Sequence, residues 1–170
     1  MGAFMVRFGL GRVAAGLLAA GVLLTAPVQA QDKALDDLVG QAQRAMQKGD
    51  PRGADNLLRK AIDMAPTRSD LYMLRSRARD SSGKYDAALE DANKYIELEP
   101  TDAYGYLNRS RIYVSLDKPE AALADANKAV EIDPQEPDAY YRRSDIYSEM
   151  GKKAEAKADE AKADELDKKR

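Results

Sequence analysis

A period of 34 residues runs through most of this sequence and restricts what the chain can fold into. Residues 86–100 (DAALEDANKYIELEP) lie 34 positions before residues 120–134 (EAALADANKAVEIDP), and nine of these fifteen positions are identical. The same spacing gives four units, at residues 35–68, 69–102, 103–136 and 137–170. Because a fixed period of this length is typical of stacked two-helix units, the sequence predicts an all-α solenoid of four helix-turn-helix repeats.

One column of the repeat holds the residue that ends each first helix. A chain that reverses direction there adopts a left-handed conformation, which favours Gly and tolerates Asp. Pro51 and Pro119 follow two positions later and are predicted to begin second helices, where the missing N–H of proline is harmless. The column contains Gly49, Gly83, Asp117 and Gly151.

Other columns indicate how the two helices of a unit pack. A bulky side chain on each first helix is followed four residues later by a small one, which allows close helix packing. A column on the second helix is always alanine: Ala54, Ala88, Ala122 and Ala156. The last predicted helix, residues 154–168, is polar, as the end of a stack requires.

Three units carry an arginine followed sixteen residues later by an aspartate. Where the first unit lacks the arginine, at Gln41, it also lacks the aspartate, at Leu57. This joint change predicts an ion pair between the two antiparallel helices of each unit, in preference to a basic stripe for a ligand. The predicted pairs are Arg75 with Asp91, Arg109 with Asp125 and Arg143 with Asp159.

The third unit resembles the tetratricopeptide repeat (TPR) family, and the resemblance extends over residues 35–170. It implies an α-α superhelix whose first helices line a concave groove for a peptide or protein segment. The three arginines depart from the family pattern, which usually has Leu there. The matching residues are Tyr106, Ser110, Tyr113, Asp117, Ala122, Ala129 and Pro134.

Helical spacing selects the residues of the first helices that face this groove rather than the core. Aromatic and arginine side chains there are typical of binding hot spots, and the alternative is that they pack against neighbouring helices. The candidate partner-binding residues are Arg77, Tyr104, Leu107, Asn108, Arg111, Tyr141 and Arg142.

Composition excludes several other functions. The chain has no Cys and no His, so disulfides, cysteine nucleophiles, imidazole bases and Cys/His zinc sites are all excluded. Its 27 basic and 29 acidic residues lack the positive excess that nucleic-acid binding needs. We therefore expect that the protein is not an enzyme and that it binds no cofactor, no metal and no nucleic acid.

Residues 1–30 differ from all that follows. Arg7 and Arg12 precede an apolar run of about thirteen residues, VAAGLLAAGVLLT, which is shorter than the roughly twenty that a membrane span needs. Pro27 and the small residues after it predict a Sec-type signal peptide at residues 1–30, cleaved between Ala30 and Gln31. Residues 31–34 are then a short lead. The alternative is an uncleaved membrane anchor.

These observations together predict a periplasmic or secreted TPR protein. It would bind a peptide or protein segment in its concave groove, with no stable membrane insertion after removal of the signal peptide. The sequence also allows a second role, as a self-associating spacer in an envelope assembly.

Overall fold

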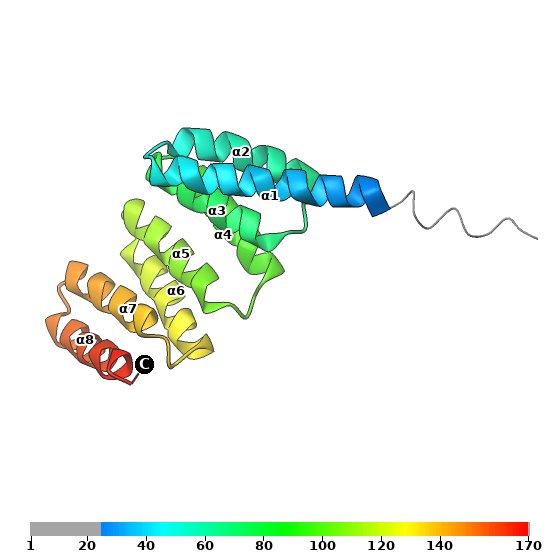
Figure 1. Cartoon of the computed structure of the whole chain (residues 1–170). Helices are drawn as coiled ribbons and strands as arrows, with labels where there is room; N and C mark the ends of the chain where they lie inside the picture. The colour runs from blue at the N-terminus through cyan, green and yellow to red at the C-terminus, as the bar shows by residue number, and fades with distance from the viewer. Residues whose placement is uncertain (1–24, 170) are drawn as a thin grey trace, which may run out of the picture. The chain divides into compact units, whose positions relative to one another are not determined.

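The computed structural model describes residues 25–169, and these form only helices and short connections (Figure 1). The predicted n-region and most of the apolar run lie outside the described residues. The chain divides into two compact units, Met1–Ala34 and Leu35–Arg170. The described part of the first unit is the beginning of a helix, so the predicted lead at residues 31–34 is helical and exposed.

The eight helices of this described part alternate between first and second helices of the predicted repeats. All are joined by connections of a few residues, as in other antiparallel helix pairs. Their bounds are α1 Thr25–Gln47, α2 Pro51–Met64, α3 Ser69–Ser81, α4 Tyr85–Leu98, α5 Ala103–Ser115, α6 Pro119–Ile132, α7 Pro137–Glu149 and α8 Lys153–Asp167.

The turn inside each repeat has the predicted left-handed residue. The backbone φ is +75° at Gly49, +76° at Gly83, +56° at Asp117 and +75° at Gly151. The amide after each one donates to a carbonyl five residues earlier, as from Lys118 N to Tyr113 O at 2.9 Å. Pro51 and Pro119 begin α2 and α6, so both parts of the turn prediction are confirmed.

The core of the second unit is built from the small and bulky columns. The alanine column of the second helices is buried: Ala54, Ala88, Ala122 and Ala156. In each of the last three repeats, a serine hydroxyl of the first helix donates to the carbonyl of this alanine on the second helix. Ser110 Oγ, for example, donates to Ala122 O at 2.9 Å. Outside consecutive pairs, α3 contacts α5 and α5 contacts α7, so these first helices form a row. That row carries the predicted groove.

Candidate functional site: a cleft along the first helices

A cleft of about 630 Å³ lies along α3, α5 and α7. Tyr95 from α4 and Asp102, just before α5, complete its wall. All seven residues selected from the sequence line it, although their role in binding stays a prediction. They are Arg77 from α3, then Tyr104, Leu107, Asn108 and Arg111 from α5, and Tyr141 and Arg142 from α7.

Two of the seven have structural roles as well. Leu107 is 9% exposed and packs in a core cluster with Ala103 and Ala129. Asn108 is 6% exposed, and its Nδ2 donates to Ser76 Oγ of the preceding repeat at 2.8 Å. For these two residues, the alternative of packing against neighbouring helices describes what the structure shows.

The three arginines of the cleft differ in how they are held. Arg111 Nε donates to Asp80 Oδ2 at 3.0 Å, and its Nη2 donates to Asn108 Oδ1 at 3.0 Å. Arg142 lies 3.9 Å from an oxygen of Asp145, one helical turn away. Arg77 is exposed, and no ion pair or hydrogen bond links its side chain to the rest of the described chain.

The tyrosines bring their hydroxyls against carboxylates. Tyr104 is 51% exposed, and its hydroxyl donates to Glu136 Oε2 at 3.2 Å. The Tyr141 hydroxyl donates to Asp164 Oδ1 at 2.7 Å, and its pKa is raised mainly by this hydrogen bond. Burial, together with a hydrogen bond to Asp102, raises the pKa of Tyr95. The hydroxyl bonds therefore orient these rings, of which Tyr95 is buried in the core and Tyr104 is the most exposed.

The cleft has no net basic charge. Arg77, Arg111 and Arg142 share it with three aspartates, Asp102, Asp138 and Asp145. Arg111 and Arg142 already have carboxylate neighbours. The electrostatic attraction for an acidic partner segment would therefore come mainly from Arg77.

The three predicted arginine and aspartate pairs are confirmed, outside the cleft. In Arg109 and Asp125 the contact is bidentate, at 2.8 and 2.7 Å, and the aspartate is buried. Hydrogen bonding to the aspartate raises the arginine pKa further above its usual value. Arg109 also lies over the ring of Tyr106 and donates to Asn93 Oδ1 of the preceding repeat at 2.7 Å. The equivalent pairs, Arg75 with Asp91 and Arg143 with Asp159, have matching geometry.

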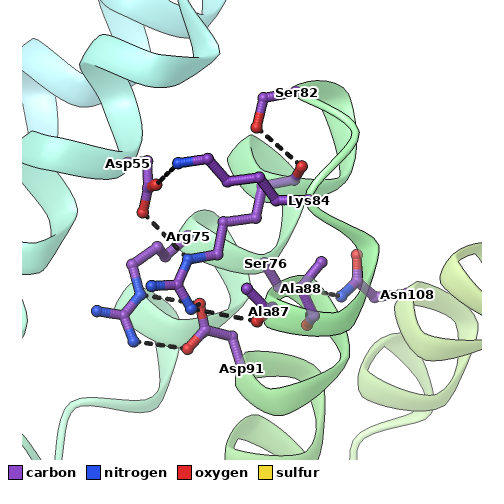
Figure 2. A network of polar contacts seen from close by, with 10 residues as sticks. Asp55, Arg75, Ser76, Ser82, Lys84, Ala87, Ala88, Asp91 and Asn108 are labelled. Carbon is purple, nitrogen blue, oxygen red and sulfur yellow. Dashed lines mark hydrogen bonds and ion pairs between the residues drawn. The ribbon is translucent and has the colours of Figure 1, made fainter.

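A polar network between the first two repeats was missed by the sequence reasoning (Figure 2). Arg79 donates to Asp55 Oδ1 at 3.1 Å and lies 2.9 Å from Asp91 Oδ2. Lys84 Nζ is 2.8 Å from Asp55 Oδ2. Burial alone would raise the pKa of Asp55, but the bonds from Lys84 and Arg79 hold it below the usual 3.8.

A signal for this network is present in the sequence. Asp55 and Arg79 are 24 residues apart, and the same columns one repeat later hold Leu89 and Tyr113. Both residues change together from charged to apolar or aromatic. Comparison of columns in neighbouring repeats, rather than within one repeat, would have found the pair.

A second pocket, of about 430 Å³, lies between the first helices of the first two repeats. Its lining is part apolar and part polar, and Arg77 belongs to both pockets. The lining residues are Ala42, Gln43, Met46, Gln47, Leu58, Leu74 and Arg77.

Neither a metal site nor a membrane span is found in the part of the chain that the structure describes. Across residues 25–169, no three acidic side chains are grouped so that they could hold a metal ion. Within the same residues, no helix is both long enough and apolar enough to cross a membrane.

Solved structures support the fold. A crystal structure of MamA superposes with a TM-score of 0.71 at 23% identity, and the match covers 85% of each chain. TTC0263, a thermophilic TPR protein of Thermus thermophilus, matches with a TM-score of 0.72 at 20% identity, over 78% of this chain and 74% of that one. The TPR domain of Arabidopsis OM64 matches with a TM-score of 0.63 at 19% identity, over 69% of this chain and 98% of that one. No curated protein matches the chain.

Family models give the same result from the sequence. Tetratricopeptide repeat models match residues 69–102, 103–136 and 126–158, which together span more than half of the chain. TPR proteins are in general non-enzymatic scaffolds for protein–protein interaction. The chain belongs to the tetratricopeptide repeat family.

Proposed function

We propose that this chain is an exported, periplasmic TPR protein that binds a peptide or protein segment in the cleft along α3, α5 and α7. The convergence of the seven candidate residues on one cleft of about 630 Å³ carries the proposal. Tyr104 contributes a half-exposed ring, and Tyr141 a second ring fixed at its hydroxyl. Rigid aromatic side chains beside arginines are the groups that dominate binding energy in protein interfaces.

Cross-linking capture from the exporting cell tests the binding surface. The variant combines Tyr104→Ala, Arg111→Ala and Tyr141→Ala, and the control combines Arg59→Ala with Tyr85→Ala, which lie outside the cleft. We expect the captured partner to be lost only with the cleft variant, while the helical circular dichroism of both variants stays that of wild type. Equal capture by all three proteins would contradict the proposal. Capture of the chain itself would favour the self-associating spacer.

The export part of the proposal rests on the sequence of residues 1–30. In the structure, Ala30 and Gln31 lie on the exposed surface of α1. N-terminal sequencing of the protein from a periplasmic fraction should begin at Gln31. Recovery of the intact chain in the membrane fraction would instead indicate an uncleaved anchor.

A further inference from the structure

The concave surface carries a chain of polar contacts at the interface between the second and third repeats. Asp80 accepts from Arg111, Arg111 donates to Asn108, and Asn108 donates to Ser76, over distances of 2.8 to 3.0 Å. The Asp80 side chain is only 12% exposed. At this interface the carboxylate partner of the arginine thus comes from within the protein.

The same four places one repeat earlier hold almost no polar groups. Met46 stands in place of Asp80, Leu74 in place of Asn108 and Ala42 in place of Ser76. Only the arginine is kept, as Arg77 in place of Arg111. All four residues line the pocket of about 430 Å³, together with the buried Leu58 and the exposed Gln43 and Gln47.

Arg77 therefore has the place of an ion-paired arginine but lacks the carboxylate that its equivalent has. An arginine beside apolar surface forms its strongest contact with a carboxylate, because two parallel N–H groups match the two oxygens. Burial of an aliphatic side chain against Met46 and Leu74 would add the hydrophobic contribution. One ligand segment can supply both groups.

We infer that the pocket between the first two repeats binds a peptide segment of another protein in which an Asp or Glu lies next to an aliphatic or Met side chain. The carboxylate takes the role at Arg77 that Asp80 has at Arg111, and the apolar side chain covers the partly exposed Met46 and Leu74. This inference rests on the proposed function, because it assumes that the concave face binds peptides. Since Arg77 also lines the larger cleft, the segment can continue along α5 and α7.

Synthetic peptides test this specificity. The probes are nine-residue peptides of Gly and Ser that carry one Glu and one Leu, separated by zero to four residues, on an array. Matched peptides replace Glu by Gln or Leu by Ser. Probed with the full-length chain, at least one Glu/Leu spacing should give binding that either replacement weakens about tenfold. Absence of binding by every Glu/Leu peptide overturns the inference.

Two variants test the site. Arg77→Glu reverses the unpaired charge, and Met46→Asp supplies within the protein the carboxylate that Asp80 supplies at the next interface. Both should abolish binding of the selected peptide while the helical signal is kept, and Arg59→Glu, on the exposed side of α2, should leave it unchanged. Binding that survives both variants overturns the inference.

The two proposals fail in different ways. Loss of binding with the Tyr104, Arg111 and Tyr141 triple variant, but not with Arg77→Glu, would keep the cleft as a binding surface and overturn the assignment of the smaller pocket. Binding unaffected by either variant would contradict both. Self-association of the chain that Arg77→Glu abolishes in light scattering would identify a second copy as the occupant, and the peptide assignment would be wrong.

Discussion

The first and second repeat interfaces exchange polar for apolar residues at two sets of equivalent places, although the second interface also has the Arg109 to Asn93 hydrogen bond. Between the first two repeats, Met46 and Leu74 stand beside Arg77 in the smaller pocket, and the ion network of Asp55 and Arg79 lies elsewhere in the interface. Between the second and third repeats, the concave face has the Asp80 and Arg111 pair. At this second interface, the positions equivalent to Asp55 and Arg79 are occupied by Leu89 and Tyr113.

This exchange separates two tasks that a repeat interface performs. Apolar contacts supply most of the stability, while directional polar contacts fix the relative orientation of two repeats. Either set can lie on either side of the interface. At the first interface, the places on the first helices that hold Asp80 and Asn108 one repeat later hold Met46 and Leu74, and this leaves a pocket with an unpaired arginine there.

The largest loss of stability is expected when Arg79, the central arginine of the network at the first interface, is removed. Arg79→Leu leaves the partly buried Asp55 with Lys84 alone, and we expect a loss of about 3 kcal/mol in the free energy of unfolding. Urea unfolding followed by circular dichroism measures it. The double variant Asp55→Leu with Arg79→Tyr copies the second interface and should recover most of the loss. A double variant as unstable as the single one would show that the two interfaces are not interchangeable.

The arginine and aspartate pair within the third repeat should give the next largest effect. Asp125→Ala leaves Arg109 half-buried without its carboxylate, with an expected loss of about 2 kcal/mol. Exchanging the two residues, Arg109→Asp with Asp125→Arg, should restore much of it in a double-mutant cycle. The coupling should be smaller between Arg75 and Asp91, because Asp91 keeps Arg79. Absence of coupling in both repeats would contradict the pairing.

A smaller effect is expected when the second interface is made to resemble the first. Asn108→Leu removes the hydrogen bonds to Ser76 and Arg111, but Ser76 keeps Ala88 O and Arg111 keeps Asp80. We expect a loss of about 1 kcal/mol in urea unfolding, since no buried polar group is left without a partner. Adding Arg111→Gln to this variant removes the arginine bond to Asp80, and the further loss in urea unfolding measures the effect of leaving the Asp80 carboxylate without it. A loss above about 3 kcal/mol for Asn108→Leu alone would indicate that Asn108 has contacts of another kind.

The smallest expected difference concerns acid pH. The pKa of Asp55 is lower in the folded protein than its usual 3.8, so its contribution to stability is present above that pH and is lost as the pH falls through the folded pKa. The protection factors of the α2 amides in hydrogen exchange, which are corrected for the intrinsic effect of pH, should therefore fall in acid more in wild type than in Asp55→Asn. The place of Asp55 in the second interface is Leu89, which does not titrate. Equal acid dependence in wild type and Asp55→Asn would contradict this role.

The sequence predicted the features that recur from repeat to repeat. The period, the left-handed residues at Gly49 and Asp117 and the pairing of Arg109 with Asp125 all follow from columns at the same place in several repeats. The places where repeats differ were not predicted. The burial of Leu107 and Asn108 depends on the side chains of the neighbouring repeat, such as Ser76, and helical spacing alone does not contain that information.

The hydrogen bonds of Arg109 to two successive repeats bear on where the array of repeats can be lengthened. Arg109 bonds Asn93 in the preceding repeat and Asp125 in its own, and Arg143 repeats this with Asn127 and Asp159. A duplicated copy of residues 103–136 placed after the original would again set its arginine opposite Asn127. The same copy placed after the first repeat would set it opposite Arg59, which is the place that Arg75 has in the chain as it is. Growth by gene duplication in the middle of the array therefore keeps the hydrogen bond between repeats, whereas growth at the start lacks it.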